Sequence, residues 1–189
     1  MSLHITLGPM FSGKTSKLMH NYELQILRNK RILVLDYDAQ AKYTGFFRGP
    51  MKNHDSKTLH ECIKTHDLMQ YDILGLTSLS DVILINECQF FDDLESYVDY
   101  CLENRKEVHV YGLDGDFEKK PMGCVLSIIP KCDTIVKLQG KCSMCPLPSL
   151  FSFRTCDSKE KILMDHTKYI PLCRQCYHKM KYQQLYDDM

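Results

Sequence analysis

Short apolar runs alternate with segments of helical periodicity through the first two thirds of the chain. Four runs have the length of buried strands, at residues 3–7, 32–35, 82–85 and 108–113. Apolar residues recur at helical spacing from Leu18 to Ile26, and a second helix is expected over residues 94–104. Strands that alternate with helices indicate an α/β fold, with a parallel sheet flanked by helices.

Polar residues stand where the predicted strands end. Asp36 follows the second run, Asn86 and Glu87 follow the third, and Asp114 follows the fourth. The carboxyl ends of parallel strands face one crevice, and ligands bind there. Residues 45–57 are instead polar and rich in turn-forming residues, which predicts a mobile loop.

The character of the chain changes near residue 140, where cysteines and basic residues become frequent. We therefore expect an α/β domain over residues 1–139 and a small cysteine-containing domain over residues 140–189. A length of 189 residues suits one domain with a small appendage.

The composition excludes several classes of protein. Hydrophobic residues make up 44% of the chain, enough to fill a core, which excludes disorder as the main state. The 24 basic residues balance 24 acidic ones, and this neutral charge argues against a protein that coats nucleic acid. No apolar run approaches the roughly 18 residues of a membrane span, and residues 1–7 lack the features of a secretory signal. We expect a cytoplasmic protein with no membrane partner, whose cysteines are free or bound to metal.

A phosphate-binding motif stands between the first predicted strand and the first predicted helix. It fits the pattern G-x-x-x-x-G-K-[ST] and consists of Gly8, Pro9, Met10, Phe11, Ser12, Gly13, Lys14 and Thr15. The glycines let backbone amides approach phosphate oxygens, and the following helix adds its positive end. Lys14 is expected to reach the β- and γ-phosphates, and the Thr15 hydroxyl to bind Mg²⁺. The motif predicts a P-loop NTPase-like fold that binds a nucleotide.

Asn86 and Glu87 occupy the strand end where nucleotide-binding α/β proteins usually present an acidic pair. An Asp at the first position holds the Mg²⁺ shell, whereas Asn86 brings no charge. Mg²⁺ binding should be weaker unless another carboxylate contributes, and Asp36, Asp114 and Asp116 are the candidates. Glu87 has the chemistry to accept a proton from an attacking hydroxyl. The alternative for Glu87 is a solvated carboxylate at a strand end.

Two pairs of cysteines near the C-terminus have the spacing of a zinc site. Cys142 and Cys145 form one C-x-x-C pair, Cys173 and Cys176 form another, and 27 residues separate the pairs. Four thiolates complete a tetrahedral Zn²⁺ shell and leave no open position, so this zinc would be structural. The gap exceeds the usual compact spacing, so a loop should project from the zinc and return. Buried free thiols are the alternative.

Taken in order, these motifs resemble the type II thymidine kinases of animal cytosol, bacteria and large DNA viruses. The resemblance spans about residues 3–180 and rests on short segments in register. They are the phosphate loop with its unusual Pro-Met-Phe, Asn53-His54-Asp55, Glu87-Cys88-Gln89-Phe90-Phe91, Leu113-Asp114-Gly115-Asp116-Phe117, Lys120-Pro121, Lys168-Tyr169 and Cys173-Arg174-x-Cys176.

The resemblance implies transfer of the ATP γ-phosphate to the 5′-hydroxyl of thymidine, with Mg²⁺ bound to ATP and Zn²⁺ as a structural ion. It implies that Glu87 is the base and that Asn86 and Gln89 belong to the ATP site. The residues it implies around the nucleoside are Met10, Asp55, Phe90, Leu113, Phe117, Met122, Gln139, Leu163, Met164 and Tyr169. It also implies a zinc-ribbon domain whose lasso loop covers the nucleoside, a homotetramer, and feedback binding of dTTP.

Four positions depart from the family pattern. Asn86 replaces the metal-shell Asp, and Ser56 stands where the family usually has Arg, so a positive charge near the phosphates is missing. Lys57 is a candidate substitute for that charge. Gln139 replaces a Thr that usually faces the pyrimidine, and Met-Asp at residues 164–165 replaces a Gly-Gly pair of the lasso.

These departures keep two alternatives open. One is a kinase for another pyrimidine deoxynucleoside, and the other is a weakly active protein that senses or sequesters nucleotides. A zinc-ribbon module that binds nucleic acid is disfavoured by the neutral charge of the chain.

Overall fold

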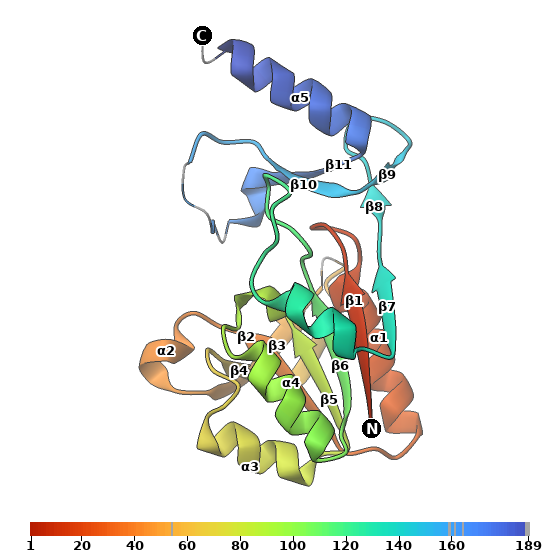
Figure 1. Ribbon diagram of the computed structural model, residues 1–189, viewed down its shortest axis with the longest axis vertical. Coiled ribbons are helices and arrows are strands. Elements are labelled where there is room, and N and C mark those ends of the chain that lie inside the picture. Colours follow the sequence, from red (N-terminus) through yellow and green to blue (C-terminus); the bar gives the residue numbers. More distant parts are fainter. Residues whose placement is uncertain (54, 159, 161, 164, 188–189) are drawn as a thin grey trace.

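The computed structural model describes residues 1–53, 55–158, 160, 162–163 and 165–187 (Figure 1). The first part of the chain contains β1 (Ser2–Leu7), α1 (Lys14–Leu27), β2 (Ile32–Tyr37), α2 (Ala41–Thr44), β3 (Phe47–Lys52), β4 (Thr58–Thr65), α3 (Tyr71–Leu79), β5 (Val82–Asn86), η1 (Cys88–Phe90), α4 (Leu94–Glu103), β6 (Glu107–Gly112), η2 (Val125–Lys131) and β7 (Thr134–Lys137). The remainder contains β8 (Gly140–Lys141), β9 (Pro148–Ser149), β10 (Phe151–Arg154), η3 (His166–Lys168), β11 (Tyr169–Leu172) and α5 (Arg174–Asp187).

Within the described residues, seven strands form one sheet in the order β3-β4-β2-β5-β6-β1-β7. Neighbouring strands are parallel, except that β3 and β4 run antiparallel. The four predicted strands are confirmed as β1, β2, β5 and β6, and the two predicted helices as α1 and α4. The chain is a mixed α/β protein with a mainly parallel sheet, as the alternation of strands and helices predicts.

The central strands are buried on both faces, which explains their continuous apolar runs. In β5, Ile83 and Ile85 belong to a core that includes Tyr97 of α4, while Leu84 belongs to a second core with Leu18 of α1. Figure 1 shows α3, α4 and η2 together in front of the sheet. A polar side chain inside such a strand would meet an apolar core on either face.

The prediction of a mobile loop over residues 45–57 is wrong for Phe47–Lys52, which form the edge strand β3. This strand pairs with β4, and its register shifts between Gly49 and Met51, where Pro50 lies. Proline has no N–H to donate, so it is tolerated on an edge strand at an irregularity of this kind. Met51 is 3% exposed and packs in the core beside α1. Pairing with β4 and one buried side chain therefore order a segment of polar composition.

The residues after β7 build a smaller unit that stands over the carboxyl ends of the sheet strands (Figure 1). Strands β8 and β9 form one antiparallel hairpin, and β10 and β11 form another. Phe153, Leu172 and Tyr177 belong to an apolar cluster separate from the two cores of the sheet. None of the described helices is long and apolar enough to cross a membrane.

Replacing Ile83 with Ala should destabilise the fold because Ile83 is fully buried in the centre of the sheet. We expect a loss of about 2–5 kcal/mol in the free energy of unfolding, measured by urea denaturation. Ile135 of the edge strand β7 is 46% exposed, so Ile135→Ala is the matched control, with a loss within about 0.5 kcal/mol. Equal losses in the two variants would contradict the placement of β5 at the core.

Candidate functional site

A cavity of about 310 Å³ opens at the carboxyl ends of the parallel strands. Its lining combines the loop between β1 and α1, the ends of β2, β5 and β6, and parts of the C-terminal hairpin. This is the edge of an open α/β sheet where ligands bind, and the volume suits a small molecule.

The loop between β1 and α1 presents polar groups for an anion. Gly13 has a φ of 84°, a left-handed conformation that favours glycine, immediately before α1. Lys14 is buried, and its Nζ donates to the Pro9 carbonyl oxygen at 2.9 Å. Burial lowers the pKa of Lys14, and the nearby Glu87 carboxylate opposes this shift. Ser12 Oγ is buried without a hydrogen-bond partner in the described part of the chain, so a bound phosphate oxygen would satisfy it.

Gln89 orients the carboxylate of Glu87 in the cavity through one hydrogen bond and is itself held by another. Gln89 Nε2 donates to Glu87 Oε2 at 2.7 Å, and Gln89 Oε1 accepts from the Leu113 backbone N–H at 2.9 Å. Glu87 has a φ of 49°, which is uncommon for a residue with a side chain and sets its direction after β5. A Cβ at Gly112 would lie 2.5 Å from Gln89 Oε1, so only glycine leaves room for this amide. The carboxylate is thus held from the ends of both β5 and β6.

A buried polar cluster joins the ends of β2, β4 and β5. Asp36 stands in register with Lys64 on one side and with Asn86 on the other. Asn86 Nδ2 donates to Asp36 Oδ1 at 2.8 Å, and Lys64 Nζ donates to Asp36 Oδ2. Burial favours the neutral amine of Lys64, but the adjacent Asp36 outweighs this, so the pKa of Lys64 is raised. All three side chains line the cavity.

Aromatic side chains form the apolar walls of the cavity. Phe90 packs against Tyr37 with ring centroids 5.2 Å apart. The Arg154 guanidinium lies over the Phe117 ring at 3.7 Å, and Arg154 Nη2 donates to the Tyr169 hydroxyl at 2.7 Å. Flat rings of this kind bind a planar ligand with little loss of conformational freedom.

Arg154 also holds the segment between β10 and β11. Its Nη1 donates to the carbonyl oxygens of Ser158, at 3.0 Å, and of Glu160. Arg154 is 3% exposed, so its guanidinium is buried between this segment and the cavity wall. One side chain therefore links the position of the segment to that of Phe117.

Two more contacts tie the C-terminal unit to the cavity. Ser152 Oγ accepts from the Met10 backbone N–H at 2.9 Å. The Tyr177 hydroxyl of α5 donates to the Phe117 carbonyl oxygen at 2.6 Å. The C-terminal hairpin thereby contacts the loop between β1 and α1 directly.

The cavity brings together most of the side chains that the sequence and the resemblance single out. They are Met10, Phe11, Ser12, Gly13, Lys14, Thr15, Asn86, Glu87, Phe90, Leu113, Phe117, Met122, Leu163 and Tyr169. Gly8, Pro9 and Gln89 do not line it, although Pro9 and Gln89 contact residues that do.

Two of the residues that the resemblance assigns to the nucleoside lie outside the lining of the cavity. Asp55 is exposed in a turn where its N–H donates to Asn53 Oδ1, and Gln139 is exposed between β7 and β8. Asp55 belongs to the turn between β3 and β4, and Gln139 precedes the C-terminal unit. Met164 lies outside the described residues, as does His54.

The cavity also contains residues that sequence reasoning missed. Tyr37 and Lys64 lie at the ends of β2 and β4 and line the cavity. Because ligands bind at the carboxyl ends of parallel strands, a correct prediction of β4 would have pointed to Lys64. Ser152 lines the cavity from β10, whose sequence Phe-Ser-Phe-Arg alternates apolar and polar residues, so a strand pattern at residues 151–154 could have pointed to it. The contact of Arg154 with Phe117 joins distant parts of the chain and has no local signal.

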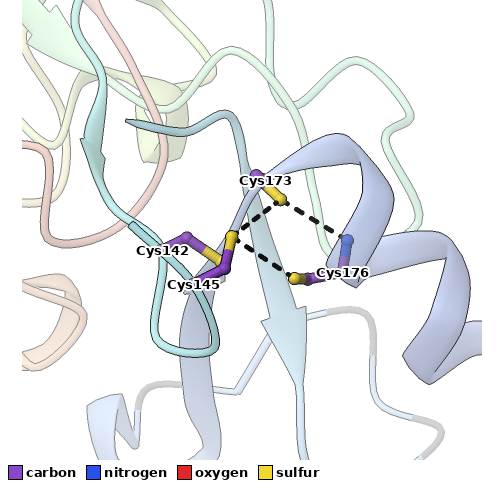
Figure 2. A group of neighbouring side chains, drawn as sticks. All are labelled: Cys142, Cys145, Cys173 and Cys176. Atoms are coloured by element: carbon purple, nitrogen blue, oxygen red, sulfur yellow. Dashed lines mark hydrogen bonds between the residues drawn. The ribbon is translucent and has the colours of Figure 1, made fainter. Parts of the chain in front are cut away.

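The four paired cysteines come together at the base of the C-terminal hairpins, as Figure 2 shows. Cys145 Sγ lies 3.6 Å from Cys173 Sγ and 3.6 Å from Cys176 Sγ. The four sulfurs, including that of Cys142, lie within 4.8 Å of one another. Tetrahedral zinc with Zn–S bonds of about 2.3 Å separates its sulfurs by about 3.8 Å. The cluster is therefore suited to hold zinc.

The comparisons with known proteins all indicate the same family. A thymidine kinase family model matches residues 1–177. The chain is 33% identical to the thymidine kinase of Amsacta moorei entomopoxvirus, over 94% of this chain and 98% of that protein. It is 33% identical to thymidine kinase a of Arabidopsis thaliana, over 93% of this chain and 74% of that protein. It is 32% identical to the human cytosolic thymidine kinase, over 94% of this chain and 73% of that protein.

Replacing Cys145 with Ser should remove bound zinc because its sulfur contacts two of the other three thiols. We expect zinc content, measured by mass spectrometry, to fall from about one ion per chain to near zero. Cys132 lies outside the cluster, so Cys132→Ser should retain the zinc. Full zinc content in the Cys145 variant would show that these thiols are not its ligands.

Proposed function

The chain belongs to the thymidine kinase family, and we propose that it transfers the γ-phosphate of ATP to the 5′-hydroxyl of thymidine, giving dTMP and ADP. The observation that best supports this is the shared cavity. It joins an anion-binding loop, an oriented carboxylate and aromatic walls, which are the parts that a nucleoside kinase requires.

The loop between β1 and α1 is the proposed P-loop. Ser12 Oγ and the amides near Gly13 would bind phosphate oxygens, and Lys14 would leave the Pro9 carbonyl to reach the transferred phosphoryl group. Thr15 and Asn86 supply oxygen atoms of the kind that Mg²⁺ prefers. Bound Mg²⁺ would neutralise the charge that develops on the phosphates.

Glu87 is the proposed base. As the 5′-oxygen bonds to the γ-phosphorus, the bond to the β,γ-bridging oxygen breaks and Glu87 takes the hydroxyl proton. Phosphoryl transfer relies chiefly on positioning, so the hydrogen bond from Gln89 matters more than the basicity of a free carboxylate. An oriented base favours an active kinase over a protein that only senses nucleotides.

The pyrimidine would lie between the aromatic walls, with the segment after β10 covering it. Phe90, Phe117 and Tyr169 supply flat apolar contacts, and Leu113 and Met122 complete the lining. Ser152 is a polar group of this lining, together with Asp116 and His166. A hydroxyl both donates and accepts, so it does not by itself distinguish thymine from cytosine. A second pyrimidine deoxynucleoside is therefore a secondary candidate substrate.

Five further properties are predicted for this chain. They are a structural zinc at the four cysteines, the division into domains at residues 139 and 140, a homotetramer, feedback binding of dTTP and a cytoplasmic location. Zinc at this place would fix both ends of the segment that covers the nucleoside, since one cysteine pair precedes β10 and the other follows β11.

Glu87→Gln should abolish most turnover while preserving ATP binding, because the base acts only in the chemical step. We expect dTMP formation to fall by about 10²–10⁴-fold, measured by chromatography of thymidine and deoxycytidine reactions. ATP binding, measured by calorimetry, should stay within about threefold. Glu103→Gln, at the exposed end of α4, is the control and should retain full activity. Normal turnover in the Glu87 variant would exclude Glu87 as the base.

Gln89→Leu should lower kcat because it removes the hydrogen bond that orients Glu87. We expect a loss of about 10–100-fold in kcat with the KM for ATP little changed, since Gln89 touches the base and does not line the cavity. Gln70 also bonds to a carboxylate, but on the exposed surface, so Gln70→Leu is the matched control. A change confined to KM would assign Gln89 to nucleotide binding instead.

A further inference from the structure

The cluster of Asp36, Asn86 and Lys64 places a buried ion pair beside the proposed P-loop. The Asp36 side chain is 7% exposed and that of Lys64 is 17% exposed. Burying an ion pair costs desolvation energy, and well-packed apolar residues in its place often give an equally stable fold. The cluster also lines the cavity, so its charge faces the place where ligand phosphates are expected. The cluster is therefore better explained by a role in ligand binding than by a role in stabilising the fold.

Hydrogen bonding fixes which end of the Asn86 amide faces Asp36. An ionised carboxylate can only accept, so the nitrogen of Asn86 must point at Asp36 Oδ1, as it does at 2.8 Å. The amide oxygen of Asn86 is consequently turned away from Asp36. A carbonyl oxygen in the lining of the cavity is a suitable acceptor for a water molecule of a Mg²⁺ shell.

The other two candidate carboxylates, Asp114 and Asp116, have partners other than Asn86, although Asp116 also lines the cavity. Asp114 pairs with Lys137. Asp116 Oδ1 accepts from the backbone N–H groups of Glu118 and Lys120, each at 2.9 Å, so it stabilises its own turn. Asp36 is the one of the three that contacts Asn86 directly.

Lys64 is a candidate to supply the positive charge that is missing at Ser56. Lys57, the sequence-based candidate for the charge absent at Ser56, forms an exposed ion pair with Glu23 of α1 and does not line the cavity. Lys64 does line it and is held in place by Asp36. The strand-end cluster thus contains both a carboxylate and an ammonium group.

Resting on the proposed kinase function, we propose that Asp36 is a positioning residue for the metal–nucleotide complex. Acting through Asn86, it supplies the negative charge that a strand-end aspartate supplies in other P-loop proteins, and it directs Lys64 toward the phosphates. In this chain the carboxylate is on β2 and the amide is on the neighbouring strand β5.

The test is the gain in ATP affinity that Mg²⁺ produces, measured by calorimetry with Mg²⁺ and with EDTA. We expect this gain to fall about tenfold in Asp36→Asn, because the charge behind Asn86 is lost. The double variant Asp36→Asn/Asn86→Asp restores one carboxylate and one amide, and should recover the gain to within about threefold. Asn86→Asp alone places two carboxylates in contact, and its gain should stay below that of the double variant.

A matched control exists on the same two strands. Asp81 and Arg31 form an exposed ion pair where β2 and β5 begin, at the opposite end of the strands from Asp36. Asp81→Asn should leave the Mg²⁺-dependent gain unchanged. If Asp36→Asn fails to fold because Lys64 is unpaired, Asp36→Asn/Lys64→Met removes both charges, and the gain should still fall.

Two results would overturn the proposal. The first is a folded variant without Asp36 in which Mg²⁺ raises the ATP affinity as much as in the wild type. The second is an Asn86→Asp variant in which Mg²⁺ raises the ATP affinity more than in the wild type. The readout is equilibrium binding, so it is separate from turnover. A wild-type chain that shows the gain but phosphorylates no deoxynucleoside would refute the proposed function and leave the role of Asp36 in place.

Discussion

Burial of both faces of the central sheet confines the polar chemistry of this chain to the ends of its strands. From Val82 to Ile85 every position of β5 faces an apolar core, and Asn86 and Glu87 are the first residues that face the cavity. The same holds for Asp36 at the end of β2. Since these strands are parallel, their ends meet at one edge of the sheet. One cavity therefore collects groups that are far apart along the chain.

The C-terminal unit completes that cavity, and its four paired cysteines form one cluster from two distant parts of the unit. Cys145, in the turn between β8 and β9, contacts Cys173 and Cys176 at the start of α5. The hairpin of β10 and β11 lies between these points in the chain, and it brings Ser152 and Arg154 to the cavity. In the proposed function, zinc at this cluster would hold the hairpin in place, since the C-terminal unit is too small to have a large apolar core of its own.

The parts of this structure that sequence predicts are those governed by local pattern. The loop between β1 and α1 and the strand end at Glu87 follow from residue spacing and apolar runs. The edge strand β3 does not, since its order comes from pairing with β4 and from the burial of Met51. The resemblance assigns Gln139 to the nucleoside, whereas in the folded chain Gln139 lies outside the lining of the cavity. Contacts such as that of Arg154 with Phe117 exist only once the hairpin is placed on the sheet.

Arg154 makes its contacts from a single buried position. It touches Phe117 and Tyr169 in the cavity wall and the carbonyl groups of Ser158 and Glu160 in the segment between β10 and β11. In the proposed kinase, release of a nucleoside from beneath this segment would require several of these contacts to break together. The time that a product stays bound would then depend on a guanidinium group that takes no part in bond making.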